Sequence, residues 1–288
     1  MVKVYDSQRK EIIIEDQFKS DFLRFLYNTV LGRLLLRIVF MQSWFWKYAA
    51  SFQKLRSTSS RVNRYVKKYD IAPTDYTQSD WRSFYDFFGR QLKPGAIKLP
   101  TSRHALIAIA EAKLLAVSIT SGLTLTVKHR KYDLTSIVGS RELAEQYKGG
   151  TALVYRLSMH NYHRYLFPDD GRLLSTNHFT GVLHTVSSIS RDYPVYSINQ
   201  RVVSVLSTEY FSEVVMIEVG AMMVGKIVNT VTTRFSRGQE KGSFKIGGST
   251  IILLYKKATI ELKDEIKKYN ERGIEVMVNI GEGIGHHV

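Results

Sequence analysis

The sequence predicts an α+β fold in which N-terminal amphipathic helices pack on a β-rich, mainly antiparallel body. Apolar residues recur at spacings of three and four between Phe18 and Ile38, which is the periodicity of an amphipathic helix. From Ala105 onward, short β-branched runs are separated by Gly, Asn and Asp, a pattern typical of strands joined by turns. We therefore expect a helical, basic region at 1–104 and a β-rich body at 105–288.

The expected elements of the first region follow in order along the chain. Residues 1–16 have three consecutive isoleucines near their end, which favours a strand or an extended arm. The amphipathic stretch comes next and leads into an aromatic cluster at 44–46. Asp80 then predicts the N-cap of a short helix that reaches Phe88.

Positive charge is concentrated in the amphipathic part of the chain. The net charge is +15, and ten basic residues but no acidic one lie between Phe22 and Tyr69. Tryptophan and arginine side chains together suit a water–lipid interface, so we expect contact with an anionic phospholipid membrane. The alternative is that the apolar stripe packs on the body and the charges are solvated. No run reaches the roughly 18 apolar residues of a spanning helix, so the expected attachment is peripheral.

In the body, short apolar runs predict the strands, and two stretches favour helices. The helices are expected near 140–147 and 260–272. The expected strands lie at 105–118, 123–128, 151–158, 182–189, 201–206, 214–219, 222–233 and 250–256. Such a series of strands joined by turns favours antiparallel pairing.

The sequence also argues against several classes of site. It has no cysteine, which excludes disulfides, a thiolate nucleophile and a Cys-based metal site. His160 and His163 are three residues apart, which on a strand places them on opposite faces, so we predict no metal site. The chain shows no RNP, KH or zinc-finger pattern, and we therefore expect no nucleic-acid partner despite the basic charge.

Five motifs in a fixed order carry information about function. Gly-Gly-Ser-Thr at 247–250 enters an apolar strand, and taken alone it predicts a tight turn, because glycine permits close backbone approach. The other motifs include one that begins Tyr-His-Arg, and they lie at 162–171, 194–201, 219–227 and 280–285. In this order and at these intervals, the set resembles the phosphatidylserine decarboxylase family over residues 80–288.

That resemblance implies a self-processing enzyme with a pyruvoyl cofactor. The hydroxyl of Ser249 would attack the carbonyl of Gly248 to form an ester, and elimination and hydrolysis would leave a pyruvoyl group in place of Ser249. The products would be a large fragment of residues 1–248 and a small fragment of residues 249–288. The pyruvoyl ketone would act as an electron sink, as pyridoxal phosphate does in other enzymes.

The resemblance also implies a substrate and its setting. The enzyme would release CO2 from phosphatidylserine and yield phosphatidylethanolamine at the cytoplasmic face of the membrane, and a homodimer is expected. His163 matches the first histidine of the Tyr-His-Arg motif, which implies a role in substrate handling or proton transfer. The alternative is that His163 is a surface histidine on a strand.

Two positions depart from the family pattern for self-cleavage, in which an aspartate and a second histidine accompany the serine. Glu111 occupies the acidic position, where its carboxylate lies one methylene further from the backbone, and Leu166 occupies the position of the second histidine. Leucine cannot accept a proton. We therefore hypothesise that His184 deprotonates Ser249, with His178 as a weaker candidate. The alternative is that His184 is structural.

These departures leave three functions open. The first is phosphatidylserine decarboxylation after self-cleavage, with Ser249, His163, Glu111 and His184 as the expected catalytic residues. The second is a homologue that binds lipid without processing itself. The third is a decarboxylase of a soluble amino acid, which would act without vesicles.

Overall fold

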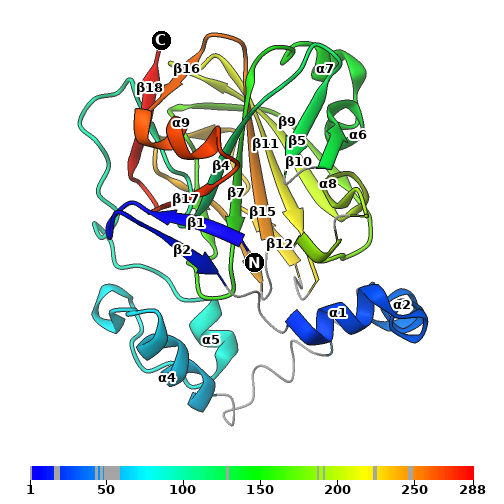
Figure 1. Ribbon diagram of the computed structural model, residues 1–288. Coiled ribbons are helices and arrows are strands. Elements are labelled where there is room, and N and C mark those ends of the chain that lie inside the picture. Colours follow the sequence, from blue (N-terminus) through cyan, green and yellow to red (C-terminus); the bar gives the residue numbers. More distant parts are fainter. Residues whose placement is uncertain are drawn as a thin grey trace.

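The frame of the molecule is a ten-stranded sheet (Figure 1). The computed structural model describes residues 2–15, 20–42, 45, 48, 59–127, 130–186, 188–190, 192–222, 226–245 and 249–288. The strands of the large sheet, in spatial order, are β13 (Arg234–Phe235), β9 (Gly171–Phe179), β10 (Arg201–Thr208), β11 (Glu213–Gly220), β15 (Ser249–Tyr255), β7 (Thr151–Leu157), β4 (Ala112–Ser118), β17 (Glu275–Val278), β1 (Val2–Asp6) and β2 (Glu11–Glu15). Neighbouring strands are antiparallel except β17 and β1, which run parallel. The predicted α+β class with a mainly antiparallel sheet is confirmed.

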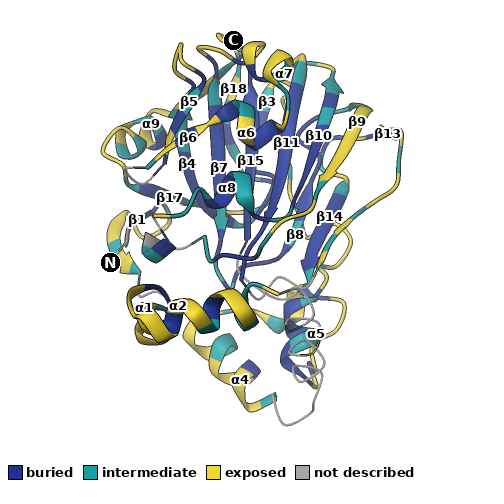
Figure 2. Cartoon of the chain, turned by 90° about the vertical axis from the view of Figure 1, so that its right-hand side faces the viewer, coloured by how far each residue is buried: buried dark blue, intermediate teal, exposed yellow. Residues whose placement is uncertain are grey.

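Smaller sheets and short helices surround this frame. The small sheets are β12 (Lys226–Asn229) with β14 (Glu240–Lys245) and β8 (Arg164–Leu166); β16 (Ile260–Leu262) with β18 (Gly283–His287) and β3 (Ala105–Ile107); and β5 (Thr124–Val127) with β6 (Arg130–Asp133). The helical elements are α1 (Ser20–Asn28), α2 (Val30–Leu35), the π-helical turn η1 (Leu36–Phe40), α4 (Ser59–Lys68), η3 (Pro73–Asp75), α5 (Phe84–Phe88), α6 (Leu134–Val138), α7 (Arg141–Glu145), η4 (Ser188–Ser190), α8 (Val195–Ile198) and α9 (Asp264–Asn270). The N-terminal helices lie at one end of the strands (Figures 1 and 2). Among the described residues, none of the helices is long and apolar enough to cross a membrane.

Strand β15 is buried on both faces because a hydrophobic core lies on each side of the large sheet. Side chains alternate along a strand, so Ile251 and Leu253 belong to one core while Ile252 and Leu254 belong to the other. Ser249 is two residues before Ile251 and therefore lies on the first of these faces. Figure 2 shows β15 with its buried neighbours β7 and β11.

The segment 182–189 does not form the predicted strand. Among its described residues, Val182 makes a single bridge, to Asn199. The Asn199 side chain takes the place of a neighbouring strand, since its Oδ1 accepts from the His184 N–H and its Nδ2 donates to the His184 carbonyl. The strand in this part of the chain is β9, which was not expected because its sequence is polar and half exposed.

The predicted cap of the helix that reaches Phe88 is also different. The structure places the N-cap at Ser83, whose Oγ accepts from the backbone N–H of Asp86. Asp80 lies three residues earlier and is exposed. The helix α5 is therefore shorter than its sequence suggested, and it places Phe84, Phe87 and Phe88 in a core of its own.

Some apolar side chains of the stripe along the first helices are buried in the protein, and others are exposed to solvent. Leu26, Tyr27 and Leu36 are buried in a small core that also includes residues of the body. Four other apolar side chains of α2 and η1 stay exposed, namely Val30, Leu31, Leu34 and Ile38. The packing alternative therefore holds for the buried part of the stripe, and membrane contact of the exposed part stays a prediction. Trp44 and Trp46, which contributed to the expected interface, lie outside the described residues.

Candidate active site

Ser249 is the first residue of β15 and is completely buried. It lies opposite Gly220 of β11 and Leu157 of β7 in the register of the large sheet. Among the described residues, no group forms a hydrogen bond with its Oγ, although a buried hydroxyl normally has a partner. Gly248 lies outside the described residues. A buried serine without a competing hydrogen bond suits a nucleophile that acts on its own peptide bond.

His163 is buried directly before β8, and its ring packs against Phe88 with the ring centroids 3.9 Å apart. Its Nδ1 lies 2.8 Å from the carbonyl oxygen of Asn161. Because a carbonyl can only accept, Nδ1 carries the hydrogen and Nε2 is the basic nitrogen of the neutral ring. The surface-strand alternative for His163 is therefore wrong.

The backbone of His163 lies beside the chain that leads to Ser249. Its carbonyl oxygen accepts from the N–H of Phe244 in β14 over 3.0 Å. Strand β14 ends at Lys245, four residues before Ser249. The structure thus brings the two motifs, far apart in the sequence, to neighbouring segments at one end of the sheets.

Glu111 holds the turn that carries His163. Its Oε1 accepts from Asn161 Nδ2 over 2.7 Å, and its Oε2 accepts from the Tyr162 N–H over 3.2 Å. Asn161 thereby contacts Glu111 through its side chain and His163 through its carbonyl. Asn161 therefore links Glu111, which occupies the predicted acidic position, to His163.

Lys113 supports the same turn from the other side. Its Nζ donates to Asn161 Oδ1 over 3.1 Å and lies 3.0 Å from Glu15 Oε1, at the end of the N-terminal hairpin. Burial lowers the pKa of Lys113, and Glu15 opposes this shift. Burial would raise the pKa of Glu15, but Arg156 and Lys113 outweigh it and hold this pKa well below its usual range. Sequence reasoning missed this network, although a lysine inside the apolar β4 was a signal.

His184 lies in the loop after β9, close to the strand that pairs with Ser249. Its carbonyl oxygen accepts from the Met222 N–H over 3.1 Å, just beyond the end of β11. Its Nδ1 lies 3.0 Å from the hydroxyl of Tyr27, and its ring stacks on Tyr193. Burial lowers the pKa of His184 to about 4, so the ring is neutral at pH 7. No contact between His184 and Ser249 appears among the described residues.

His178, the weaker candidate for the base, lies further away. It is exposed on β9 and pairs with Val202 of β10. Strands β10 and β11 separate it from β15. Its position is therefore that of a solvated side chain on the edge half of the sheet.

Comparison with known proteins identifies the family. Residues 84–286 match the family model described as phosphatidylserine decarboxylase. The chain is 39% identical over 285 residues to phosphatidylserine decarboxylase proenzyme 2 of Clostridium acetobutylicum, covering 99% of this chain and 98% of that protein. It is 32% identical over 292 residues to the phosphatidylserine decarboxylase proenzyme of Clostridium botulinum, with 99% of both chains covered. The chain belongs to the phosphatidylserine decarboxylase family. A proenzyme of Fusobacterium nucleatum is 33% identical over 297 residues, covering 99% of this chain and 98% of that protein.

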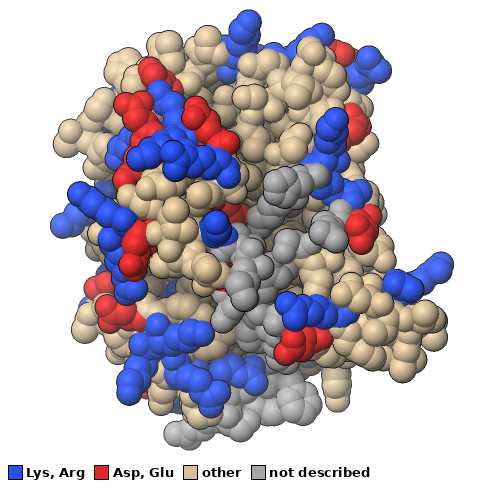
Figure 3. All heavy atoms as spheres, viewed as in Figure 1, with Lys and Arg blue, Asp and Glu red and all other residues tan. Residues whose placement is uncertain are grey.

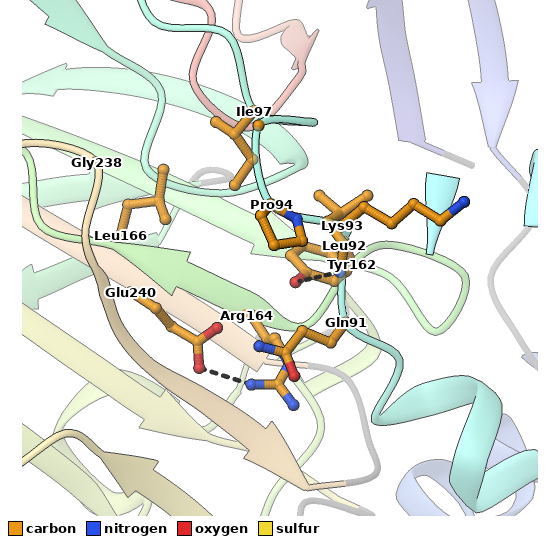
Figure 4. Close-up of a pocket in the computed structure, with 11 residues that line it drawn as sticks. Gln91, Leu92, Lys93, Pro94, Ile97, Tyr162, Arg164, Leu166, Gly238 and Glu240 are labelled. Atoms are coloured by element: carbon orange, nitrogen blue, oxygen red, sulfur yellow. Dashed lines mark hydrogen bonds and ion pairs between the residues drawn. The ribbon is translucent and has the colours of Figure 1, made fainter. Parts of the chain in front are cut away.

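In this phosphatidylserine decarboxylase, the position expected for a second histidine lines a cavity. Leu166 is buried, and it borders a space of about 250 Å³ together with Tyr162, Arg164 and Glu240 (Figure 4). Arg164 and Glu240 form an ion pair of 2.7 Å across the wall of this cavity. Tyr162 and Arg164 flank His163 in the chain. Leucine has no proton acceptor, so Leu166 does not act as a base in the decarboxylase.

The decarboxylase site thus contains one cluster joined by hydrogen bonds, and His184 lies outside that cluster. His163, Glu111 and Asn161 are joined by hydrogen bonds beside β14. His184 lies apart from this cluster, beside the end of β11, the strand that pairs with β15. Asn161 was missed from the sequence because nothing in its local pattern distinguishes it from a turn residue.

Proposed function

We propose that this protein cuts itself between Gly248 and Ser249 and then decarboxylates phosphatidylserine to phosphatidylethanolamine. As a phosphatidylserine decarboxylase it is a carboxy-lyase made as a proenzyme, and its cofactor is a serine-derived pyruvoyl group. The observation that supports Ser249 as that serine is its buried Oγ at the start of β15, without a hydrogen-bond partner among the described residues.

The cleavage itself uses only atoms of the chain, and the hydrolysis that follows consumes one molecule of water. Ser249 Oγ attacks the carbonyl carbon of Gly248, the peptide C–N bond breaks, and the proton of the hydroxyl ends on the freed nitrogen. The ester that results joins residues 1–248 to the side chain of Ser249. Elimination then releases residues 1–248 with a terminal carboxylate, and hydrolysis of the remaining N-terminus expels ammonia and leaves the ketone.

The position of Ser249 fits the cofactor. The backbone there is fixed on both sides, by Gly220 and by Leu157, and the surroundings are dry. The pyruvoyl group supplies an electron sink that no standard side chain offers. A dry site favours the loss of charge that accompanies release of CO2 from a carboxylate.

His163 and Glu111 have separate proposed roles. His163 presents Nε2 as its basic nitrogen, and we assign it the proton transfer to or from the substrate carbon. Glu111 is the positioning carboxylate that fixes Asn161 and Tyr162, and through them the tautomer and orientation of His163. A carboxylate with two donors is well suited to holding a turn.

His184 is our proposed base for Ser249. It is neutral because burial lowers its pKa to about 4, and a base must begin in the neutral form. For Nε2 to accept the proton, Nδ1 must carry the hydrogen and donate it to Tyr27. Tyr27 Oη also accepts from the Thr185 N–H over 3.1 Å, so the hydroxyl is held in place.

We also propose that residues 1–104 bind the membrane and residues 105–288 carry the chemistry. The exposed apolar side chains of α2 and η1 are interleaved with Arg33 and Arg37. Lys and Arg side chains gather over α4 in Figure 3, and the exposed basic residues of that helix are Arg61, Arg64, Lys67 and Lys68. This combination supports peripheral contact with an anionic phospholipid surface at the cytoplasmic face. A homodimer is part of the same proposal, by family resemblance.

The first experiment is the intact mass of the purified protein under denaturing conditions. A fragment of residues 249–288 blocked by a pyruvoyl group would establish cleavage at Ser249. A single species of 33.1 kDa that persists after long incubation with lipid would contradict the proposal and favour a lipid-binding homologue. Decarboxylation of a soluble amino acid without vesicles or detergent would replace phosphatidylserine as the substrate.

A further inference from the structure

A buried ion pair joins β11, which pairs with Ser249, to β14, which precedes Ser249 in the chain, and no step described above uses it. Lys241 Nζ on β14 donates to Glu218 Oε1 on β11 over 2.5 Å. The two side chains are 3% and 0% exposed. Removing two charges from water costs several kcal/mol per ion, and apolar residues of similar volume often replace such pairs without loss of stability. Stability alone therefore gives little reason for a charged pair in this core.

Two further polar side chains complete the group around Glu218. Asn229 on β12 donates to Glu218 Oε2 over 3.4 Å, and its Oδ1 accepts from the hydroxyl of Tyr165 on β8 over 2.7 Å. Gly242 makes room for both, since a Cβ there would lie 2.3 Å from Asn229 Oδ1 and 2.8 Å from the Tyr165 hydroxyl. The group thus connects β11 of the large sheet to all three strands of the small sheet β12-β14-β8.

Three of these strands, β11, β8 and β14, lead to a reactive residue. Glu218 pairs with Ile251, and Gly220, two residues later, pairs with Ser249. Glu218 therefore lies on the same face of the large sheet as Ser249. Strand β8 begins one residue after His163, and β14 continues into the segment that ends at Ser249. The ion pair lies between the strand that fixes Ser249 and the sheet that carries His163.

We propose that Glu218 and Lys241 are positioning residues for the reactions at Ser249. Their directional bond fixes the small sheet, with His163 at the start of one strand and the cleavage segment at the end of another, against β11. Misplacement of reacting groups by ~1 Å can slow a reaction on the order of 100-fold. Loss of the pair should therefore slow self-cleavage and decarboxylation even where the protein still folds.

The test is a double variant that leaves no unpaired buried charge. Glu218→Gln with Lys241→Met keeps the side-chain volumes close and lets Gln bond Asn229. The matched control is Glu213→Gln with Lys256→Met, because that pair also joins β11 to the chain of β15, over 2.9 Å, at the opposite end of the strands. The double variant and the control variant are made by cell-free synthesis that is stopped at a known time. Loss of the uncut chain is then followed on a denaturing gel.

We expect cleavage of the Glu218–Lys241 double variant to be about 10- to 100-fold slower than wild type, with kcat reduced in the matured fraction and KM little changed. The control should mature at the wild-type rate. The pH dependence of cleavage should keep its shape, because a positioning residue exchanges no proton with the substrate. Thermal midpoints of all proteins are measured to separate slow chemistry from poor folding.

Three outcomes would overturn the proposal. The first is a wild-type cleavage rate and kcat in the double variant. The second is an equal slowing of cleavage in the control variant. The third is loss of one limb of the pH profile of cleavage, which would make Glu218 an acid or base. If the double variant does not fold, Tyr165→Phe removes one outer hydrogen bond and should slow cleavage about fivefold; a wild-type rate would count against the proposal. The inference rests on the proposed cleavage at Ser249, and failure of the wild-type chain to cut itself would show that this earlier step is wrong.

Discussion

Tyr27 and His184 are 157 residues apart in the chain but lie in contact, with the Tyr27 hydroxyl 3.0 Å from Nδ1 of the histidine. Tyr27 belongs to α1, whose neighbouring helices present apolar side chains to solvent, whereas His184 lies beside the end of β11. The hydroxyl is held a second time by the Thr185 N–H. A helix next to the proposed membrane-contacting α2 therefore holds a hydrogen bond to the proposed base.

His184→Ala should slow self-cleavage on the order of 10²- to 10⁴-fold, because Ser249 would lose its base. Tyr27→Phe should slow it only about fivefold, since it removes one hydrogen bond worth roughly 1 kcal/mol. Time courses of cleavage on denaturing gels measure both. His178→Ala is the matched control, because that histidine is exposed on β9. Maturation of His184→Ala at the wild-type rate would show that another group activates Ser249.

His163→Gln should mature and then decarboxylate phosphatidylserine on the order of 10²- to 10⁴-fold more slowly than wild type. In the wild type, the bond from Nδ1 to the Asn161 carbonyl leaves Nε2 of His163 as the acceptor nitrogen, and a glutamine side chain is not a comparable base. Asn161→Ala loses the bonds to Glu111 and Lys113 but keeps the backbone carbonyl, so a smaller loss of kcat is expected. Release of CO2 from matured protein measures both. A wild-type kcat for His163→Gln would remove this residue from the reaction.

Stability should fall as the pH falls from about 6.5 toward 4, because His184 and His160 are neutral in the folded protein and become charged in the unfolded chain. Burial lowers the pKa of His184 to about 4, and burial together with Lys113 lowers the pKa of His160 to about 2. The unfolded chain therefore binds more protons in this range, and the free energy of unfolding decreases with decreasing pH.

Thermal midpoints recorded between pH 7 and about pH 5.5 test this prediction. The histidines titrate there in the unfolded chain, whereas carboxylates remain largely ionised. His160→Gln should show a shallower dependence on pH than wild type, since one of the two groups is gone. An exposed histidine such as His178 gives the control variant. A midpoint that stays constant over this range would mean that neither histidine is held neutral in the folded protein.

Buried strands could be predicted from the sequence because their residues are mostly apolar. Strands β7, β11 and β15 read as apolar runs, and each was expected within one or two residues of its bounds. Strand β9 could not be found this way, because five consecutive residues, from Leu174 to His178, are exposed and most are polar. The segment 182–189 misled for the opposite reason, since it is apolar but its described residues form no strand, and the Asn199 side chain bonds the backbone of His184.

Part of the site was accessible to sequence reasoning and part was not. Ser249 and His163 lie in motifs whose order is informative. The contacts of Asn161 with Glu111 and Lys113 bridge about fifty residues each and arise only when β4 lies beside β7. Glu218 carried a local signal, an acidic residue inside the apolar β11, but its partner Lys241 could not be identified before the small sheet was seen to pack on the large one.

Membrane contact through α2 should depend on its exposed leucines. Leu31 and Leu34 are 60% and 53% exposed, and each buried leucine contributes about 1.5–3 kcal/mol when it leaves water. Leu31→Glu with Leu34→Glu should therefore weaken sedimentation with phosphatidylserine-containing vesicles at least tenfold. The cleavage rate should not change, because neither side chain contacts the site among the described residues.

Val231→Glu is the matched control, because this valine is fully exposed on the loop after β12. It should bind vesicles as wild type does. Binding of the wild type should also weaken with added salt and on neutral phosphatidylcholine vesicles, since nearby basic residues contribute about 1 kcal/mol each at an anionic surface. Unchanged binding of the double leucine variant, with the salt dependence intact, would move the membrane contact from α2 to the basic helix α4. Equal loss in the Val231 variant would mean that added negative charge, and not the apolar face, accounts for the effect.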